Sequence, residues 1–173
     1  MATFTWHNGE VPKGMEVTQV YGVVFTKDGR ILLMSQEKAS GRVYSLSGGT
    51  PENFDKSKED TLRRELFEEV NVTIEKPIML GYQEVDEENG RAPYAQVRMT
   101  AIIENIGPSR PDPDNGKTYD RILTSPKRAI ELLNWGETGR LQIEEAVRIA
   151  KEQLGITKFS DKEEFINKNN KTL

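Results

Sequence analysis

The feature that most constrains the fold is one strongly amphipathic helix with strand-like segments on both sides of it. Ser57 precedes this helix, and Asp60 follows three residues later in a capping-box arrangement that marks a helix start. Leu62, Leu66 and Val70 recur every four residues, which gives the helix a single apolar stripe. Such a stripe has to be covered by another layer. Strands and helices mix along the chain in an order that predicts a sheet with helices on both faces.

The other segments predict one domain over residues 15–157. Lys27-Asp28-Gly29 is a hairpin turn signal between two apolar runs. Strands are expected over residues 17–25, 30–35, 42–46, 78–85, 95–105 and 121–123, and further helices over 126–133 and 141–154. Residues 1–14 are expected to form a separate N-terminal segment. Residues 158–173 are charged and rich in Asn and Lys, which predicts a frayed C-terminal tail.

The residue types that are missing exclude several kinds of site. The chain of 173 residues has no cysteine, which excludes disulfides, zinc–thiolate clusters and a cysteine nucleophile. His7 is the only histidine, so a two-histidine metal site is excluded. We expect His7 to lie on the surface of a poorly ordered terminus. Chemistry in this protein must therefore rest on carboxylates, Lys, Arg, Tyr or a hard metal ion.

Charge and hydropathy limit the expected partners. Asp and Glu number 28 against 24 Lys and Arg, which gives a formal net charge of −4. This balance, without a basic patch interleaved with aromatic residues, argues against a nucleic-acid groove. No apolar run approaches the length of about 20 residues that crosses a bilayer, and the first residues lack the basic head and apolar core of a signal peptide. We therefore expect no membrane partner and a cytoplasmic location.

Three carboxylates crowd one edge of the helix. At about 100° per residue, Glu65, Glu68 and Glu69 fall within an arc of roughly 100° beside the apolar stripe. Like charges that close repel one another unless a cation joins them. Hard oxygen ligands, with no second histidine and no cysteine, point to Mg²⁺ or Mn²⁺. Arg64 stands next to these glutamates and can pair with one of them. The alternative is an ordinary solvated helix face.

The segment from Gly49 to Val72 resembles the Nudix box, the motif of the Nudix hydrolase family. That box consists of Gly, five residues, Glu, seven residues, and then Arg-Glu-apolar-x-Glu-Glu-x-Gly-apolar. Three departures are present: Asp55 stands in place of Glu, one residue is inserted before Arg64, and Asn71 replaces the closing Gly. The change to Asn is mild, because Asn also adopts the left-handed conformation that ends helices.

The resemblance implies a Nudix-type α/β/α sandwich with a mixed sheet between the helices. It also implies metal-dependent hydrolysis of a nucleoside diphosphate linked to another group, a small-molecule substrate such as a nucleoside triphosphate, a nucleotide sugar or ADP-ribose. By similarity, Glu65 and Glu69 are expected to bind Mg²⁺ or Mn²⁺, with Glu68 assisting and a backbone carbonyl at Gly48 or Gly49 adding a ligand. The expected catalytic residues are Glu68, Glu69 and Arg64. A glutamate of the box or of a later loop would act as general base.

Weaker signals concern the substrate. Arg98 and Arg121 lie on or near predicted strands and are candidates to bind phosphate, with a structural ion pair as the alternative for each. Asp55 is a further candidate to bind substrate, although a shorter carboxylate in a longer loop reaches less far toward the metal. Further candidates are the acidic turn 86–88 as a source of the base, the polar loop 107–119 as a lid, and the rings of Tyr82 and Trp135 as stacking surfaces.

Two questions stay open at the level of sequence. A catalytically impaired Nudix-fold module that binds nucleotides or regulates a partner is the alternative to an enzyme, because the box loop is altered. The intact cluster of three carboxylates disfavours that alternative, since binding alone does not require it. No symmetric interface can be read from the sequence, so a monomer and a homodimer both remain open.

Overall fold

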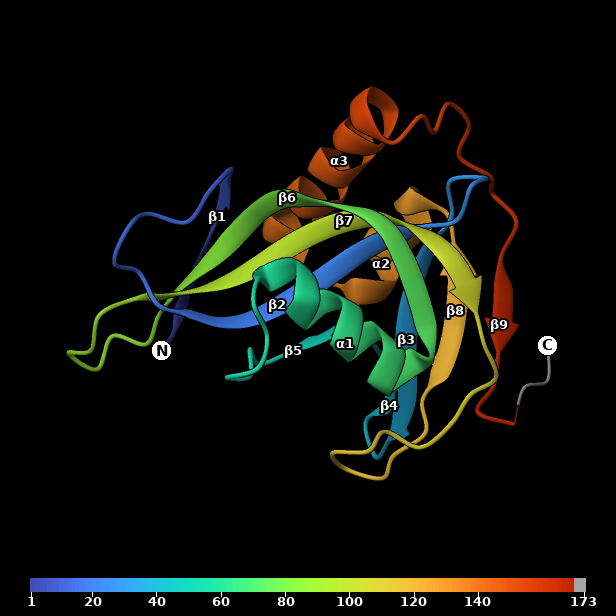
Figure 1. Cartoon of the computed structure of the whole chain (residues 1–173), viewed down its shortest axis with the longest axis horizontal. Helices are drawn as coiled ribbons and strands as arrows, with labels where there is room; N and C mark the ends of the chain where they lie inside the picture. The colour runs from blue at the N-terminus through green and yellow to red at the C-terminus, as the bar shows by residue number, and fades with distance from the viewer. Residues whose placement is uncertain (170–173) are drawn as a thin grey trace.

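A single mixed sheet forms the centre of the protein. The computed structural model describes residues 1–169. Within this range nine strands form the sheet in the order β1-β6-β7-β2-β3-β8-β9, with β4 paired to β3 and β5 paired to β2 (Figure 1). The strands are β1 (Thr3–Asn8), β2 (Val17–Phe25), β3 (Ile31–Lys38), β4 (Gly41–Ser45), β5 (Ser47–Gly49), β6 (Val72–Asp86), β7 (Tyr94–Ile106), β8 (Asp120–Thr124) and β9 (Glu164–Ile166). The β2–β7 pair is parallel, and the other pairs described are antiparallel.

Helices cover both faces of this sheet. They are α1 (Lys58–Val70), α2 (Pro126–Leu133) and α3 (Gly136–Gln153). One apolar cluster joins α1 to one face, and a second cluster joins α2 and α3 to the opposite face (Figure 1). The predicted α/β/α sandwich with a mixed sheet is therefore confirmed.

Strand β2 runs through the middle of the sandwich and is buried on both faces. Val20 and Val24 belong to the cluster under α1, whereas Val23 and Phe25 belong to the cluster under α2 and α3. A strand covered on both faces has a continuous apolar run in place of strict alternation. This requirement explains the apolar run from which the strand was predicted.

Helix α1 has the ends that the sequence predicts. The Ser57 hydroxyl accepts a hydrogen bond of 3.2 Å from the Asp60 N–H, and Asn71 adopts the left-handed conformation at φ 51° and ψ 52°. Leu62 and Leu66 are fully buried. The caps fix where the helix starts and stops, so they also fix which side chains project at its polar edge.

Helix α3 starts five residues earlier than the predicted 141–154. The first turn contains Gly136 and Gly139, and glycine is a poor helix former, which hid this turn in the sequence. The extra turn matters because it places Trp135, immediately before the helix, against the sheet.

The two ends of the described chain are ordered as edge strands, in contrast to the expectation. The N-terminal segment contains β1, which pairs with β6, and His7 on it stacks on Tyr82 at 4.9 Å between ring centres. In the predicted tail, β9 pairs with β8 and Phe165 packs against the core. Both segments are ordered, despite their polar composition, because their backbones form hydrogen bonds with the free edges of β6 and β8. Residues 170–173 of the tail lie outside the described residues.

No helix in residues 1–169 is long and apolar enough to cross a membrane.

Candidate active site

The acidic edge of α1 lies against β5. Glu69 is 9% exposed, and its Oε1 accepts hydrogen bonds from the Ser47 hydroxyl at 2.9 Å and from the Gly48 N–H at 2.7 Å. The pair of glycines in β5 lets this strand sit close to the helix. A Cβ atom on Gly49 would overlap the carboxylate of Glu65, which lies directly over the glycine. Two of the three predicted carboxylates are therefore held at one short strand.

Arg64 links two of the predicted carboxylates, Glu65 and Glu68, to the loop before the helix. Its Nη1 donates to Glu65 Oε1 at 2.9 Å and to Glu68 Oε2 at 3.1 Å. Its Nε and Nη2 donate to the two oxygens of Asp55 at 3.1 and 2.9 Å, and Nη2 also donates to the Thr50 carbonyl. One guanidinium thus fixes the positions of Glu65 and Glu68 relative to the loop.

Burial raises the pKa values of both buried carboxylates. Burial raises the pKa of Glu69 to about 7, against the lowering effect of its hydrogen bonds with Gly48 and Ser47. Burial likewise raises the pKa of Glu65, although the charge of Arg64 opposes the shift. A cation placed between these oxygens would favour their ionised forms.

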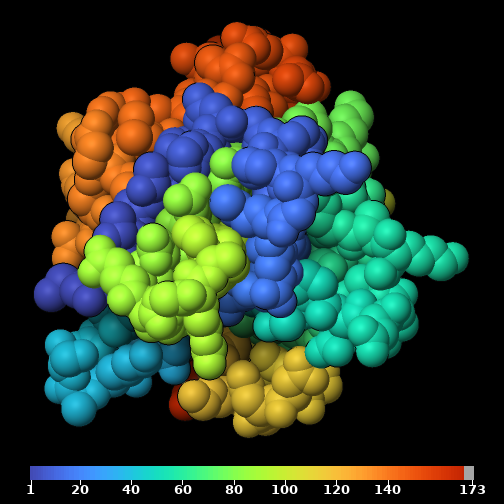
Figure 2. All heavy atoms as spheres, turned by 90° about the vertical axis from the view of Figure 1, so that its left-hand side faces the viewer, coloured from blue at the N-terminus to red at the C-terminus, as the bar shows by residue number. Residues whose placement is uncertain are grey.

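The loop over residues 107–119 brings Asp112 and Asp114 to this edge, and the charge of Asp114 adds to the upward shift of the Glu65 pKa. The Arg110 guanidinium donates to the Phe67 carbonyl and the Asn71 amide donates to the Pro108 carbonyl, both at 2.9 Å, which holds the loop against the end of α1. Asp112 on this loop is 4% exposed, and its charge adds to the upward shift of the Glu69 pKa. Figure 2 shows the loop, in gold, below the teal atoms of α1 and of the segment before it. The predicted lid therefore borders the carboxylates.

The chemistry of these donors fits a hard divalent cation, although the side chains are not yet arranged around one. Glu65, Glu68 and Glu69 offer carboxylate oxygens beside the flexible backbone of Gly49, the ligand type that Mg²⁺ and Mn²⁺ prefer. Within residues 1–169, no three acidic or histidine side chains already form a metal cage. Glu65 and Glu68 are instead bonded to Arg64, so binding of a cation requires these two side chains to turn.

Comparison with known proteins identifies the family. A family model of the NUDIX domain matches residues 15–138. The chain belongs to the Nudix family. It is therefore a Nudix hydrolase, and such enzymes generally use divalent metal ions. No curated protein matches the sequence.

Solved Nudix structures share the fold at low sequence identity. The pyrophosphohydrolase BsRppH of Bacillus subtilis is 15% identical with a TM-score of 0.63, over 85% of this chain and 91% of that chain. A MutT structure from work on Aliivibrio salmonicida and Vibrio cholerae is 15% identical with a TM-score of 0.54, over 75% and 98% of the two chains. A Nudix structure from Listeria monocytogenes is 16% identical with a TM-score of 0.58, over 79% and 95%.

The structure shows how the residues that depart from the Nudix box, Asn71 and Asp55, are accommodated. Asn71 closes the helix as the usual glycine would. Asp55 reaches Arg64 from the longer loop, and its oxygens also accept from the Glu52 N–H and the Thr61 hydroxyl, each at 2.9 Å. The Arg64 bond holds the pKa of Asp55 down at about 2. These contacts favour a positioning role for Asp55 over the substrate-binding role that the sequence suggested.

The two predicted phosphate-binding arginines lie in different surroundings. Arg121 is 2% exposed and donates to the carbonyls of Val70 and Gly107, so it supports the end of the Nudix helix and the loop that follows β7. These contacts favour a structural role. Arg98 is 3% exposed and lies away from the box, on the sheet face that α3 covers, where its Nε donates to Gln142.

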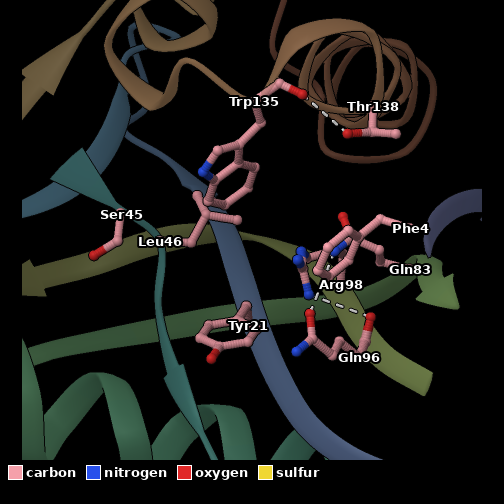
Figure 3. Close-up of a pocket in the computed structure, with 9 residues that line it drawn as sticks. All are labelled: Phe4, Tyr21, Ser45, Leu46, Gln83, Gln96, Arg98, Trp135 and Thr138. Atoms are coloured by element: carbon pink, nitrogen blue, oxygen red, sulfur yellow. Dashed lines mark hydrogen bonds between the residues drawn. The ribbon is translucent and has the colours of Figure 1, made fainter. Parts of the chain in front are cut away.

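Arg98 lines a pocket of about 400 Å³ between the sheet and α3 (Figure 3). Its other walls come from Phe4, Tyr21, Ser45, Leu46, Gln83, Gln96, Trp135 and Thr138. Of the two rings singled out in the sequence, Trp135 is in this pocket, whereas Tyr82 is 5% exposed and packs in the core under His7. The acidic turn 86–88 makes hydrogen bonds to the N-terminus and to Tyr94.

Sequence reasoning missed the groups that hold the carboxylates in place. Ser47 is a plain hydroxyl residue in the printed sequence, and its bond with Glu69 spans 22 positions. Tyr21 is an ordinary strand residue in the sequence, although it lines the pocket and its backbone pairs with Gly48, which holds Glu69. The only local signal was the Gly48-Gly49 pair, which indicated a close backbone approach without saying to what.

Proposed function

We propose that this protein is a Mg²⁺- or Mn²⁺-dependent hydrolase that cleaves the pyrophosphate linkage of a nucleoside diphosphate joined to another group. The observation that carries the proposal is the pair Glu65 and Glu69, two buried carboxylates with raised pKa values at the Gly48-Gly49 strand. The pyrophosphohydrolase activity of the Bacillus subtilis relative supports the same reaction class.

The chain supplies the ligands and the base. Glu65, Glu68, Glu69 and the backbone of Gly49 would hold the metal, whose charge would neutralise phosphate oxygens and acidify water. Arg64 would keep Glu65 and Glu68 close enough to act together. Glu68 or Glu69 would accept the proton of the attacking water. Glu69 is suited to this step because its carboxylate is buried and held in place by the Ser47 hydroxyl and the Gly48 N–H.

The Asp55–Arg64 contact speaks against the impaired binding module. The inserted residue and the shorter acid were the reasons to suspect lost turnover. The structure nevertheless keeps Arg64 bonded to Asp55 on one side and to Glu65 and Glu68 on the other. A cytoplasmic location stays a prediction from the sequence, and a monomer and a homodimer both stay open.

The test is product release from a panel of nucleoside triphosphates, nucleotide sugars and ADP-ribose, with Mg²⁺, with Mn²⁺ and with chelator. We expect metal-dependent cleavage of at least one compound by the wild type. Glu69→Gln should lower kcat by about 10³-fold or more, as expected for a metal ligand or base. Glu152→Gln, an exposed acid on α3, is the matched control and should keep full activity. Absence of cleavage across the panel, with metal still bound, would favour the binding module.

A further inference from the structure

Arg98 is a buried cation without a carboxylate partner. Within residues 1–169 its hydrogen bonds run from Nε to the Gln142 side chain and from Nη1 to the Gln96 carbonyl, and neither acceptor is a carboxylate. Burial lowers its pKa to about 10. The guanidinium instead lies over two aromatic rings, 4.8 Å from the centre of Tyr21 and 5.7 Å from that of Trp135. A buried cation of this kind is stabilised by an acceptor supplied from outside the chain.

A chain of hydrogen-bonded glutamine side chains determines which donor and acceptor groups face the pocket. Arginine only donates, so Gln142 must turn its oxygen to Arg98 Nε, at 2.9 Å. The Gln142 amide then donates to Gln83 at 3.2 Å, Gln83 donates to Gln96 at 3.5 Å, and Gln96 donates to Gln19 at 2.8 Å. Each amide oxygen is used by the preceding residue. The remaining N–H groups of Arg98 make the polar wall of the pocket rich in donors, and it therefore fits a ligand edge with acceptors.

The pocket and the carboxylates lie at one level of the sheet. Tyr21 pairs with Gly48 of β5 on one side and with Arg98 of β7 on the other. Gly48 is the residue whose N–H donates to Glu69. Neighbouring strands are about 4.8 Å apart, so the Arg98 backbone is about 10 Å from that of Gly48. Tyr21, which also lines the pocket, therefore stands on the strand between Gly48 and Arg98.

We propose that this pocket binds the base of the nucleotide substrate and that Arg98 selects a base with a ring carbonyl, such as hypoxanthine, guanine or uracil, over adenine. The inference rests on the proposed function, because it assumes that the diphosphate lies at Glu65 and Glu69. Tyr21 and Trp135 are aromatic side chains able to pack against a flat ring, and Figure 3 shows both around the space beside Arg98.

The walls argue against phosphate as the occupant. Arg98 is the only charged residue among those that line the pocket, and much of the remaining surface is aromatic or aliphatic, from Phe4, Tyr21, Leu46 and Trp135. A phosphate group carries several charged oxygens and is usually met by several donors of the backbone or by more than one cation. A carbonyl oxygen needs one or two N–H donors, which the guanidinium has free.

The test uses two ligands that differ at one position. Inosine 5′-monophosphate has a carbonyl at C6 where adenosine 5′-monophosphate has an amino group. In the full-length Trp6→Phe protein, Trp135 is the single tryptophan and reports binding by fluorescence. Titrations are done in chelator, so that no turnover occurs. We expect the inosine nucleotide to bind about tenfold more tightly, the discrimination expected of a good bidentate arginine contact. Uridine against cytidine monophosphate repeats the comparison at C4.

Variants assign the effect to Arg98. Arg98→Met should bring the two affinities together, and Arg98→Lys should keep only part of the preference, because lysine lacks the planar fork. Glu152→Gln, an exposed position on α3 that does not line the pocket, is the control and should keep the preference. Only a variant that still binds both ligands is counted, because a misfolded protein that binds neither would also show no preference.

The outcomes separate this inference from the proposed function. Equal affinities for the paired ligands, or no binding of either, would overturn the choice of base even if the enzyme cleaves nucleotides. Inorganic pyrophosphate is titrated in the same way. If it changes Trp135 fluorescence, displaces the nucleotide and loses both effects in Arg98→Met, the pocket is a phosphate site and the inference is overturned. A preference for the carbonyl base together with no cleavage of any compound would support the pocket assignment and refute the hydrolase.

Discussion

Asp55 and Arg64 meet through two parallel hydrogen bonds, Nε to Oδ1 at 3.1 Å and Nη2 to Oδ2 at 2.9 Å. The pair spans the inserted residue of the Nudix box. A shorter acid at the tip of a longer loop thus forms the forked contact that arginine prefers with carboxylates. The same guanidinium holds Glu65 and Glu68, so the loop length bears directly on the geometry of the carboxylates.

The first prediction concerns acid stability. The pKa of Asp55 is about 2 in the folded protein and close to 3.8 when unfolded, so its contribution is full above about pH 4 and is lost as pH falls toward 2. Asp55→Asn should lower the free energy of unfolding at pH 7 by about 1–2 kcal/mol and should flatten its decline between pH 4 and 2. Urea unfolding at a series of pH values measures both. A variant with the wild-type acid dependence would show that the pair does not act on stability.

The second prediction is that Glu69→Gln stabilises the metal-free protein. The folded pKa of about 7 exceeds the unfolded value of 4.5, so the folded state holds its proton longer and stability falls as pH rises from about 4.5 to 7. At pH 8 in chelator, the variant should be more stable by about 1–3 kcal/mol, because the neutral amide avoids the buried charge. At pH 4 the two proteins should be alike. Thermal unfolding at both pH values is the measurement, and a less stable variant at pH 8 would contradict the assigned charge state.

The third prediction is that Gly49→Ala lowers activity strongly but stability only slightly. The added methyl group overlaps the Glu65 carboxylate, which is the far end of a flexible side chain and can move aside. We expect a change in melting temperature of only a few degrees and a fall in kcat of at least tenfold, since a misplaced ligand lowers metal-assisted rates strongly. The double variant Gly49→Ala, Glu65→Asp shortens the acid and should recover part of the metal affinity. Full activity in Gly49→Ala would show that Glu65 need not occupy that place.

The fourth prediction concerns β9. Deletion of residues 161–173 removes the Thr124–Glu163 bond of 2.8 Å and takes Phe165 from beneath Arg42. Stability should drop by about 1–3 kcal/mol, or several degrees in melting temperature. The activity of the folded fraction at low temperature should be unchanged, because β9 lies at the far edge from β5. Deletion of residues 170–173 alone is the control. An unchanged melting temperature after the longer deletion would mean that β9 adds nothing.

The central part of the fold could be predicted because its signals are local. Ser57, Asn71 and the apolar stripe of α1 act within a few residues, and helix bounds follow from such neighbours. The edge strands β1 and β9 could not be predicted, since their order comes from pairing with β6 and β8. The sequence of a polar segment does not show whether a free strand edge elsewhere in the fold will pair with it.

The candidate site divides in the same way. The helical spacing alone indicated that Glu65, Glu68 and Glu69 lie together. The environment of Arg98 could not be read, because burial, the contact with Gln142 44 positions away and the flanking rings all arise from the tertiary fold. An arginine on a strand looks the same in sequence whether it faces water, a carboxylate or a pocket.

The parallel pairing of β2 with β7 sets the order in which this molecule is assembled during synthesis. Thr100 on β7 donates to the Val23 carbonyl on β2 across 77 positions. Until the ribosome has released β7, the central strand lacks its parallel neighbour, and the N–H and C=O groups along that edge have no strand to pair with. The Nudix helix emerges well before this point, as an amphipathic segment whose sheet is still incomplete. The nascent chain therefore reaches its active form late, and its earlier stages are the ones most exposed to aggregation and to chaperones.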